Sequence, residues 1–269
     1  MSSSEKWSDL TARLGSGIGM VLAGAWGIWM GDHVFHVMVA AICGLMVWEL
    51  VSILRGAEGP DSDGRNLQML LGLLTGAVVL VSVYIPAGFA LPLLLAPALL
   101  GFGQLSRNRT IFMSFTVLIL LSGFGMMQVR DEMGVGWMLW LVLVVVVTDV
   151  VGYFAGRTFG GPKFWPKVSP KKTWSGTAAG WVGAGIVGAL FSVNTGVGLQ
   201  LIGISIAISM ASQMCDIAES GMKRKMGVKD SSNLIPGHGG LMDRFDGMLG
   251  ASVFLLIIGQ FIGFPPGLG

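Results

Sequence analysis

Long apolar runs alternate with short polar segments along the whole chain. Each run is long enough for a transmembrane helix, which needs about 20 apolar residues, and the runs are too continuous for the alternating strands of a membrane β-barrel. Nine such runs cover residues 15–31, 34–54, 67–85, 87–105, 111–128, 135–155, 177–193, 197–214 and 248–264. The pattern therefore predicts an all-α, polytopic integral membrane protein with about nine transmembrane helices.

The basic residues predict an orientation for these helices. Cytoplasmic loops of membrane proteins carry an excess of Lys and Arg. With nine spans and a cytoplasmic N-terminus, every Lys and Arg except Arg130 lies on the cytoplasmic side, whereas an even number of spans spoils this asymmetry. We therefore expect the N-terminus and the two long charged loops, residues 156–176 and 215–247, to face the cytoplasm.

The first apolar run has an alternative interpretation as a cleaved signal peptide. Residues 14–31 follow basic residues, and Leu22–Ala25 offers small side chains for cleavage. However, the run continues through Trp26 and Trp29, and its removal would place both charged loops on the wrong side. A retained first helix is therefore the better interpretation.

Composition agrees with a single membrane domain over residues 1–269. Hydrophobic residues make up 53% of the chain and charged residues only 12%, and no repeat or Pro-Ser linker separates soluble domains. The domain divides into N-terminal transmembrane helices, residues 1–130, and a transmembrane region, residues 131–269, that holds both charged loops. Cys43 and Cys215 lie in or beside predicted spans, so no disulfide framework is indicated.

Glycine is abundant, with 42 residues, and its spacing within the apolar runs predicts close helix packing. The clearest groups are Gly72 with Gly76, and Gly180 with Ala184 and Gly188. The same surfaces would allow a homodimer, although packing within one chain uses the same residues.

The loop at 215–247 concentrates chemical groups between two apolar runs. Acidic and basic residues surround a Pro-Gly-His-Gly-Gly turn in this loop. The acidic residues are Asp216, Glu219, Asp230, Asp243 and Asp246, and the basic residues are Lys223, Arg224, Lys225, Lys229 and Arg244. Mg²⁺ prefers one or two carboxylates plus phosphate oxygens, while Lys and Arg neutralise further phosphate charge. The loop is therefore expected to bind a metal ion and phosphate groups together.

The loop at 156–176 is basic and contains several Gly and Pro residues. Its segment Ser169–Thr173 places two hydroxyls and the ammonium groups of Lys171 and Lys172 just before a helix, whose N-terminal amides also favour anions. This arrangement favours polyphosphate binding, although an ordinary positive-inside loop is also basic. The Walker A pattern is absent, which excludes a P-loop.

A carboxylate within an apolar run is costly unless it has a function. Asp149 lies near the end of such a run, and Gly152, Tyr153 and Gly156 follow it at helical spacing. The same spacing recurs at Asp216, Glu219, Ser220 and Lys223. Both polar faces are expected to point into a shared cavity.

Two other polar groups are given no catalytic role. His33 and His36 lie beside Asp32 in the first hairpin, where a solvated turn is expected. Glu49 lies inside the second apolar run, where it can snorkel, pair with Arg55 or reach the cavity. We leave Glu49 outside the candidate site.

These motifs together resemble the phosphatidate cytidylyltransferases, also called CDP-diacylglycerol synthases. That family's signature corresponds here to Ser220, Lys223, Arg224, Lys229, Asp230, Pro236–Gly240, Asp243, Arg244 and Asp246. Ser169–Thr173 and the helix face that begins at Asp149 are also similar to the family. Residues 1–130 resemble it only in hydropathy and length, and Ser175 and Cys215 depart from the residues expected there.

The resemblance implies transfer of the cytidylyl group of CTP to phosphatidate, which gives CDP-diacylglycerol and pyrophosphate for phospholipid biosynthesis. It implies Mg²⁺ as cofactor, with room for a second cation. The expected partners are CTP, phosphatidate and membrane lipids, and no nucleic acid. The expected location is the bacterial inner membrane, with the catalytic loops facing the cytoplasm.

The resemblance also implies roles for individual residues. Metal binding is assigned to Asp216, Asp243 and Asp246, and catalysis to these three with Lys223 and Arg224. Substrate binding is assigned to Asp149, Ser169, Lys171, Lys172, Thr173, Lys229, His238, Gly239, Gly240 and Arg244. Asp149 is either a further metal ligand or a contact to the nucleotide, and His238 either binds phosphate or orders its turn.

Two alternative functions are compatible with the sequence. A CTP-dependent polyprenol or lipid kinase would transfer the γ-phosphate and release CDP rather than pyrophosphate. A membrane transporter would explain the glycine-rich helices and the intramembrane Asp149. It would not explain why basic residues concentrate in two loops on one face, so catalysis is favoured.

Overall fold

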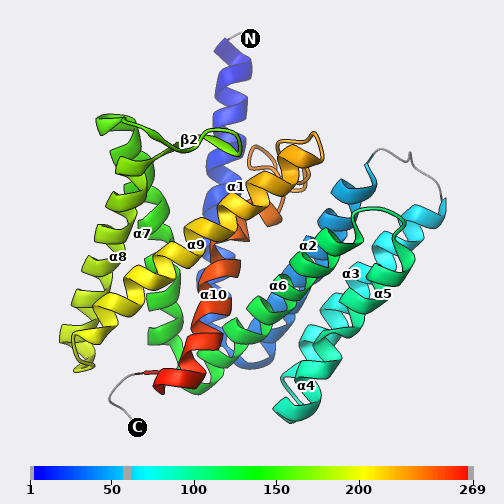
Figure 1. The fold of residues 1–269 in the computed structure, drawn as a ribbon, viewed down its shortest axis with the longest axis horizontal. Helices are drawn as coiled ribbons and strands as arrows, with labels where there is room; N and C mark the ends of the chain where they lie inside the picture. Colours follow the sequence, from blue (N-terminus) through cyan, green and yellow to red (C-terminus); the bar gives the residue numbers. More distant parts are fainter. Residues whose placement is uncertain (1–2, 57–61, 266–269) are drawn as a thin grey trace. The chain divides into compact units, whose positions relative to one another are not determined.

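The computed structural model describes residues 3–56 and 62–265, which form helices and one small β-hairpin (Figure 1). In chain order the helices are α1 Ser3–Met30, α2 Asp32–Arg55, α3 Ser62–Ser82, α4 Ala87–Leu94, α5 Ala96–Gln104, α6 Arg109–Gln128, α7 Val135–Phe159, α8 Trp174–Thr195, α9 Gln200–Lys225 and α10 Met242–Ile262. A short π-helix, η1 Val129–Met133, continues α6. Strands β1 Lys163–Trp165 and β2 Ser169–Thr173 pair antiparallel between α7 and α8.

Within the described residues, seven helices are long and apolar enough to cross a membrane. They are α2, α3, α6 with η1, α7, α8, α9 and α10. The predicted all-α architecture of a polytopic membrane protein is therefore confirmed. In the described part of the chain, the β1–β2 hairpin is the exception to it.

The predicted span at residues 87–105 forms two short helices rather than one continuous helix. α4 ends at Leu94 and α5 begins at Ala96. Pro97 has no amide hydrogen to donate to the carbonyl of Leu93, and its ring would clash with that carbonyl in a continuous helix. The break therefore follows from the proline.

The chain divides into two compact units. Unit 1 consists of Met1–Met127 and Lys225–Phe245, and unit 2 consists of Gln128–Arg224 and Asp246–Gly269. The division after Met127 lies close to the predicted division at residue 130. A single membrane domain over the whole chain stays a prediction.

In unit 1, glycine allows α2 and α3 to approach at backbone distance. A Cβ added at Gly72 would lie 3.0 Å from the carbonyl oxygen of Gly44, and one added at Gly76 would lie 3.2 Å from that of Ala40. The predicted packing role of Gly72 and Gly76 is therefore confirmed.

In unit 2, α7 and α8 lie side by side and antiparallel (Figure 1). A Cβ added at Gly180 would lie 3.1 Å from the carbonyl oxygen of Thr148, so α8 could not approach α7 as closely with a larger residue there. Gly188 contacts α9 in the same way, because its added Cβ would lie 2.8 Å from the carbonyl oxygen of Leu201. Both glycines have the packing role that their spacing predicts.

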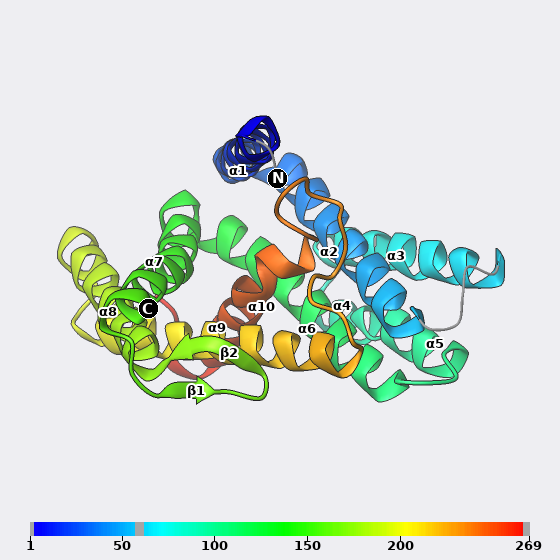
Figure 2. The same cartoon turned by 90° about the horizontal axis from the view of Figure 1, so that it is seen from above.

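Both charged loops are shorter than the sequence predicts. α7 continues to Phe159 and α8 begins at Trp174, so the first loop is mainly the β1–β2 hairpin, which projects from the adjoining ends of these helices (Figure 2). α9 continues to Lys225 and α10 begins at Met242, which leaves residues 226–241 between them. Hydropathy marks only the apolar part of a helix, whereas these helices continue through charged residues.

Gly250 on α10 contacts the backbone of α9, and it provides a test of this packing. A Cβ there would collide with the carbonyl oxygen of Ala211. We expect Gly250→Ala to destabilise the protein by about 1–3 kcal/mol, because overpacking pushes α10 away from α9. The matched control is Gly203→Ala on α9, where a Cβ meets nothing within 4 Å. Thermal unfolding in detergent measures both, and equal melting temperatures for the two variants would contradict the expectation.

Candidate active site

Unit 2 contains a cavity of about 590 Å³. α7 contributes Asp149, Gly152, Tyr153 and Gly156 to its wall, which is the helix face described from the sequence. The charged lining residues are Asp149, Arg157, Lys163, Lys171, Lys172 and Asp216. The hairpin thus supplies ammonium groups, while α7 and α9 supply the carboxylates.

Polar contacts fix α7, α8 and α9 around this cavity. The hydroxyls of Thr148 on α7 and Ser209 on α9 are 2.8 Å apart and hydrogen bonded. Trp181 Nε1 on α8 donates to Gln213 Oε1 on α9 at 2.9 Å, and Gln213 Nε2 donates to the carbonyl of Thr177 at 3.3 Å. Because Thr148 precedes Asp149 directly and Gln213 lies three residues before Asp216, these contacts hold both carboxylates in place.

Lys172 and Asp216 form an ion pair between the hairpin and α9. Their side chains are 26% and 25% exposed, so the pair is only partly shielded from water. Next to Lys172, Thr173 Oγ1 accepts a hydrogen bond from the amide of Gly176 at 3.2 Å and caps α8. The cap fixes the backbone from which Lys172 extends.

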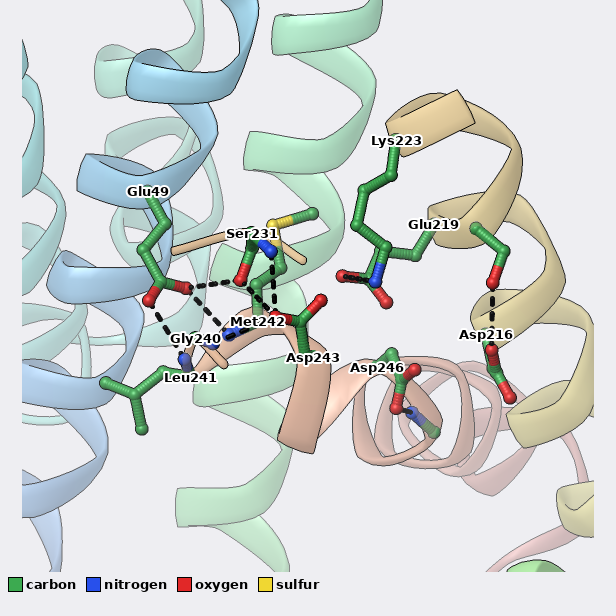
Figure 3. A network of polar contacts seen from close by, with 12 residues as sticks. Glu49, Asp216, Glu219, Lys223, Ser231, Gly240, Leu241, Met242, Asp243 and Asp246 are labelled. Atoms are coloured by element: carbon green, nitrogen blue, oxygen red, sulfur yellow. Dashed lines mark hydrogen bonds and ion pairs between the residues drawn. The ribbon is translucent and has the colours of Figure 1, made fainter. Parts of the chain in front are cut away.

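Asp246 on α10 belongs to a group of carboxylates in unit 2. It interacts with Asp216, Glu219 and Asp149. Glu219 is fully buried and pairs with Lys223 at 3.1 Å, one helical turn away (Figure 3). Lys223, to which the resemblance assigned a catalytic role, lies in this ion pair and does not line the cavity. The charges of Asp216 and Asp149 repel an ionised Asp246, whereas Glu219 is its side-chain hydrogen-bond partner, and a bound cation would reduce the repulsion.

Asp243 lies in unit 1 and orders the segment before α10. Its Oδ2 accepts hydrogen bonds from the Ser231 amide at 2.8 Å, the Ser231 hydroxyl at 2.9 Å and the Gly240 amide at 2.8 Å (Figure 3). One oxygen of this predicted metal ligand is therefore used by the chain itself.

His238 is held by α1 within unit 1. Ser16 Oγ lies 2.9 Å from His238 Nδ1 and donates to the carbonyl of Pro236 at 2.9 Å. Gly237 and Gly239 on either side have φ values of 75° and 84°, a conformation that favours glycine. The His238 ring therefore orders its turn through Nδ1, which is one of the two roles considered for it.

Glu49 was left out of the candidate site in the sequence analysis. In the structure it contacts the segment between α9 and α10. Its side chain is fully buried, and both of its oxygens accept hydrogen bonds from residues 231–242. A carboxylate inside an apolar run was the available signal, the same signal that identified Asp149. His33 and His36, expected in a solvated turn, lie in α2 and hydrogen bond to Tyr84; His33 is exposed, whereas His36 is buried.

The remaining predicted residues have other positions. Ser169 begins β2 and does not line the cavity. Three basic residues are exposed, namely Arg224, Lys229 and Arg244. The predicted residues of unit 1 are Lys229, His238, Gly239, Gly240, Asp243 and Arg244, and those of unit 2 are Asp149, Ser169, Lys171, Lys172, Thr173, Asp216, Lys223, Arg224 and Asp246.

The carboxylate oxygens of unit 2 are suitable ligands for Mg²⁺. Across the residues that the structure describes, no group of three His, Cys, Asp or Glu side chains forms a ready-made metal site. Mg²⁺ does not require one, because it binds through one or two carboxylates and takes waters and substrate phosphates as its other ligands. Asp246 and Asp216, whose charges interact in unit 2, are carboxylates of this kind, and Asp216 is paired with Lys172. Metal binding by Asp216, Asp243 and Asp246 stays a prediction.

The fold and the cavity define a polytopic membrane protein with a site suited to anionic ligands. Residues 11–262 match the model of the cytidylyltransferase family, and the chain belongs to this family. The resemblance drawn from the sequence motifs is therefore confirmed.

Curated relatives carry a more specific name. The chain is 40% identical over 139 residues to a protein of Brucella abortus, covering 50% of this chain and 51% of that protein. It is 41% identical over 161 residues to a protein of Staphylococcus saprophyticus, covering 56% and 61%, and 38% identical over 156 residues to one of Mycobacterium tuberculosis, covering 56% and 46%. All three are named phosphatidate cytidylyltransferase. The matches thus span about half the length of these relatives.

Proposed function

We propose that the protein transfers the cytidylyl group of CTP to phosphatidate and releases pyrophosphate. The observation that carries this proposal is the cavity of unit 2, in which Lys171 and Lys172 face the carboxylates of Asp149 and Asp216 on apolar helices. A triphosphate needs the ammonium groups, and a lipid substrate needs access along the apolar helices. Family membership and the names of the relatives support the same reaction.

The chemistry requires little acid–base catalysis from the protein. The phosphomonoester of phosphatidate has a second pKa near 6, so its attacking oxygen is already anionic at neutral pH. That oxygen attacks the α-phosphorus of CTP. The bond between the α-phosphorus and the oxygen that bridges the α- and β-phosphates then breaks, and this oxygen leaves with pyrophosphate. The obstacle is repulsion between two anions, which Lys171 and Lys172 reduce by binding phosphate oxygens.

The carboxylates have a different part in this proposal. Asp216 and Asp246 of unit 2 would hold Mg²⁺, which would neutralise phosphate charge, while the roles of Asp243 and of a second cation stay predictions. Asp149 would contact the nucleotide or complete the metal site. Lys223 and Arg224, with Lys229 and Arg244, would bind phosphate groups of the substrates or of the leaving pyrophosphate.

The proposal includes an orientation in the membrane. We place nine spans with a cytoplasmic N-terminus in a bacterial inner membrane, counting α1 and the broken α4–α5 segment with the seven long apolar helices. The distribution of Lys and Arg supports this arrangement. The β1–β2 hairpin and the loop of residues 226–241 would then both face the cytoplasm, where CTP is present. The homodimer stays a prediction.

The reaction products test the proposal against its alternatives. Purified protein in detergent should release pyrophosphate when given CTP, phosphatidate and Mg²⁺ together, and none when any one of them is omitted. Release of CDP in place of pyrophosphate would indicate a CTP-dependent lipid kinase. Unchanged CTP, in a preparation with a cooperative thermal transition, would overturn both enzymatic functions and favour transport.

A further inference from the structure

Glu49 is a fully buried carboxylate on a membrane helix, and its acceptor capacity is used by one segment of unit 1. Oε1 accepts from the Ser232 hydroxyl at 2.6 Å and the Leu241 amide at 2.9 Å. Oε2 accepts from the Met242 amide at 2.8 Å, and it lies 3.2 Å from the Ser231 hydroxyl, which shares its single proton between Glu49 and Asp243 (Figure 3). A carboxylate accepts about four hydrogen bonds, so this arrangement nearly saturates the group.

Two of these four donors belong to the start of α10. The first amides of a helix have no partner within the helix, and they form the positive end of the helix dipole. Glu49 supplies the missing acceptor for Leu241 and Met242 from α2, and Asp243 supplies it for Gly240. The start of α10 is therefore capped from another helix, and not by a neighbouring residue alone.

The same contacts determine the backbone of the glycine turn. Ser231 connects Glu49 to Asp243, because its hydroxyl contacts both carboxylates. A Cβ added at Gly240 would collide with the Ser231 hydroxyl and would lie 2.5 Å from Glu49 Oε1, so no side chain fits between them. The direction of the Gly240 backbone is thus fixed by Glu49 and Asp243 together.

We infer that Glu49 is a positioning residue, which anchors residues 231–242 and thereby holds the glycine turn and the first turn of α10 in the geometry for cytidylyl transfer. The inference rests on the proposed function for its kinetic consequence. The anchoring itself rests on three hydrogen bonds to a buried group and a fourth that Ser231 shares with Asp243. Glu49 acts through the backbone of residues 231–242 and not through contact with a substrate.

Glu49→Gln tests the inference with a nearly isosteric change. The amide oxygen can serve only one of the two backbone amides, and the NH₂ group then faces the other amide as a second donor. We expect kcat to fall by about 10²-fold, the typical effect of a displacement of about 1 Å in a positioning group. The KM for phosphatidate should stay unchanged, and Glu49→Ala should lose more activity than Glu49→Gln.

Hydrogen–deuterium exchange provides a measurement that does not depend on the reaction. Residues 231–242 should exchange faster in Glu49→Gln, while the melting temperature stays within a few degrees of wild type. The matched control is Glu132→Gln, which makes the same change at an exposed carboxylate in η1. It should match wild type in both measurements.

The outcomes separate the inference from the proposed function. Unchanged exchange in Glu49→Gln would overturn the anchoring role, whatever the activity. Faster exchange with wild-type kcat would overturn the positioning role. If the wild-type protein makes no CDP-lipid although Glu49→Gln exchanges faster in this segment, the proposed function fails and the anchoring role is supported.

Discussion

Replacing Asp246 by Asn is expected to lower turnover by about 10³-fold, or roughly 4 kcal/mol of transition-state stabilisation. The change preserves size and removes one charge from a group in which Asp246 interacts with Asp216, Glu219 and Asp149. If this group binds Mg²⁺, loss of the charge weakens the metal site that offsets the repulsion between substrates. Initial rates of pyrophosphate release at saturating substrates measure the effect.

The same variant should have the opposite effect on the stability of the metal-free protein. Removing the charge of Asp246 relieves its repulsion with Asp216 and Asp149, so thermal unfolding with a chelator should occur at the wild-type temperature or above it. The stabilisation that Mg²⁺ gives the wild-type protein should be lost. Asp131→Asn, an exposed carboxylate in η1 of the same unit, is the matched control. Wild-type activity together with wild-type stabilisation by Mg²⁺ would remove Asp246 from the metal site.

The helices could be predicted because the membrane imposes one simple requirement. Backbone groups in lipid must be bonded within a helix, so apolar runs of sufficient length predict helices almost by themselves. Helix ends are less predictable, since α9 continues through charged residues to Lys225 and α8 begins where the Thr173 side chain can cap it. The β1–β2 hairpin depends on pairing between short polar strands, which hydropathy does not detect.

The residue types of the site could be predicted from the sequence, but their partners could not. Asp149 and Asp216 line one cavity, as the matching spacing of the polar residues that follow them indicates. The ion pair of Lys172 with Asp216 joins a hairpin to a helix far along the chain. The contacts of Glu49 join α2 to a segment more than 180 residues later. Such long-range pairs follow from tertiary packing, which local patterns do not contain.

The ion pair between Lys172 and Asp216 leads to a second large effect. We expect Lys172→Ala to lower kcat/KM for CTP by about 10²-fold, or roughly 2.7 kcal/mol, because a charge-assisted contact to phosphate is lost. The KM for phosphatidate should change little if the hairpin binds the triphosphate. Steady-state rates at varied CTP and fixed phosphatidate measure the effect on CTP. Rates at varied phosphatidate and fixed CTP measure the effect on phosphatidate.

Lys167→Ala is the matched control for this variant, since Lys167 is an exposed residue of the same hairpin segment that does not line the cavity. Equal CTP kinetics in the two variants would show that Lys172 does not bind CTP.

A further measurement distinguishes the loss of a phosphate contact from general damage to the site. Lys172 competes with any cation for Asp216, so its removal should lower the Mg²⁺ concentration needed for half-maximal activity even as CTP use becomes weaker. A damaged site would instead need more Mg²⁺, because distorted ligands bind the metal less well.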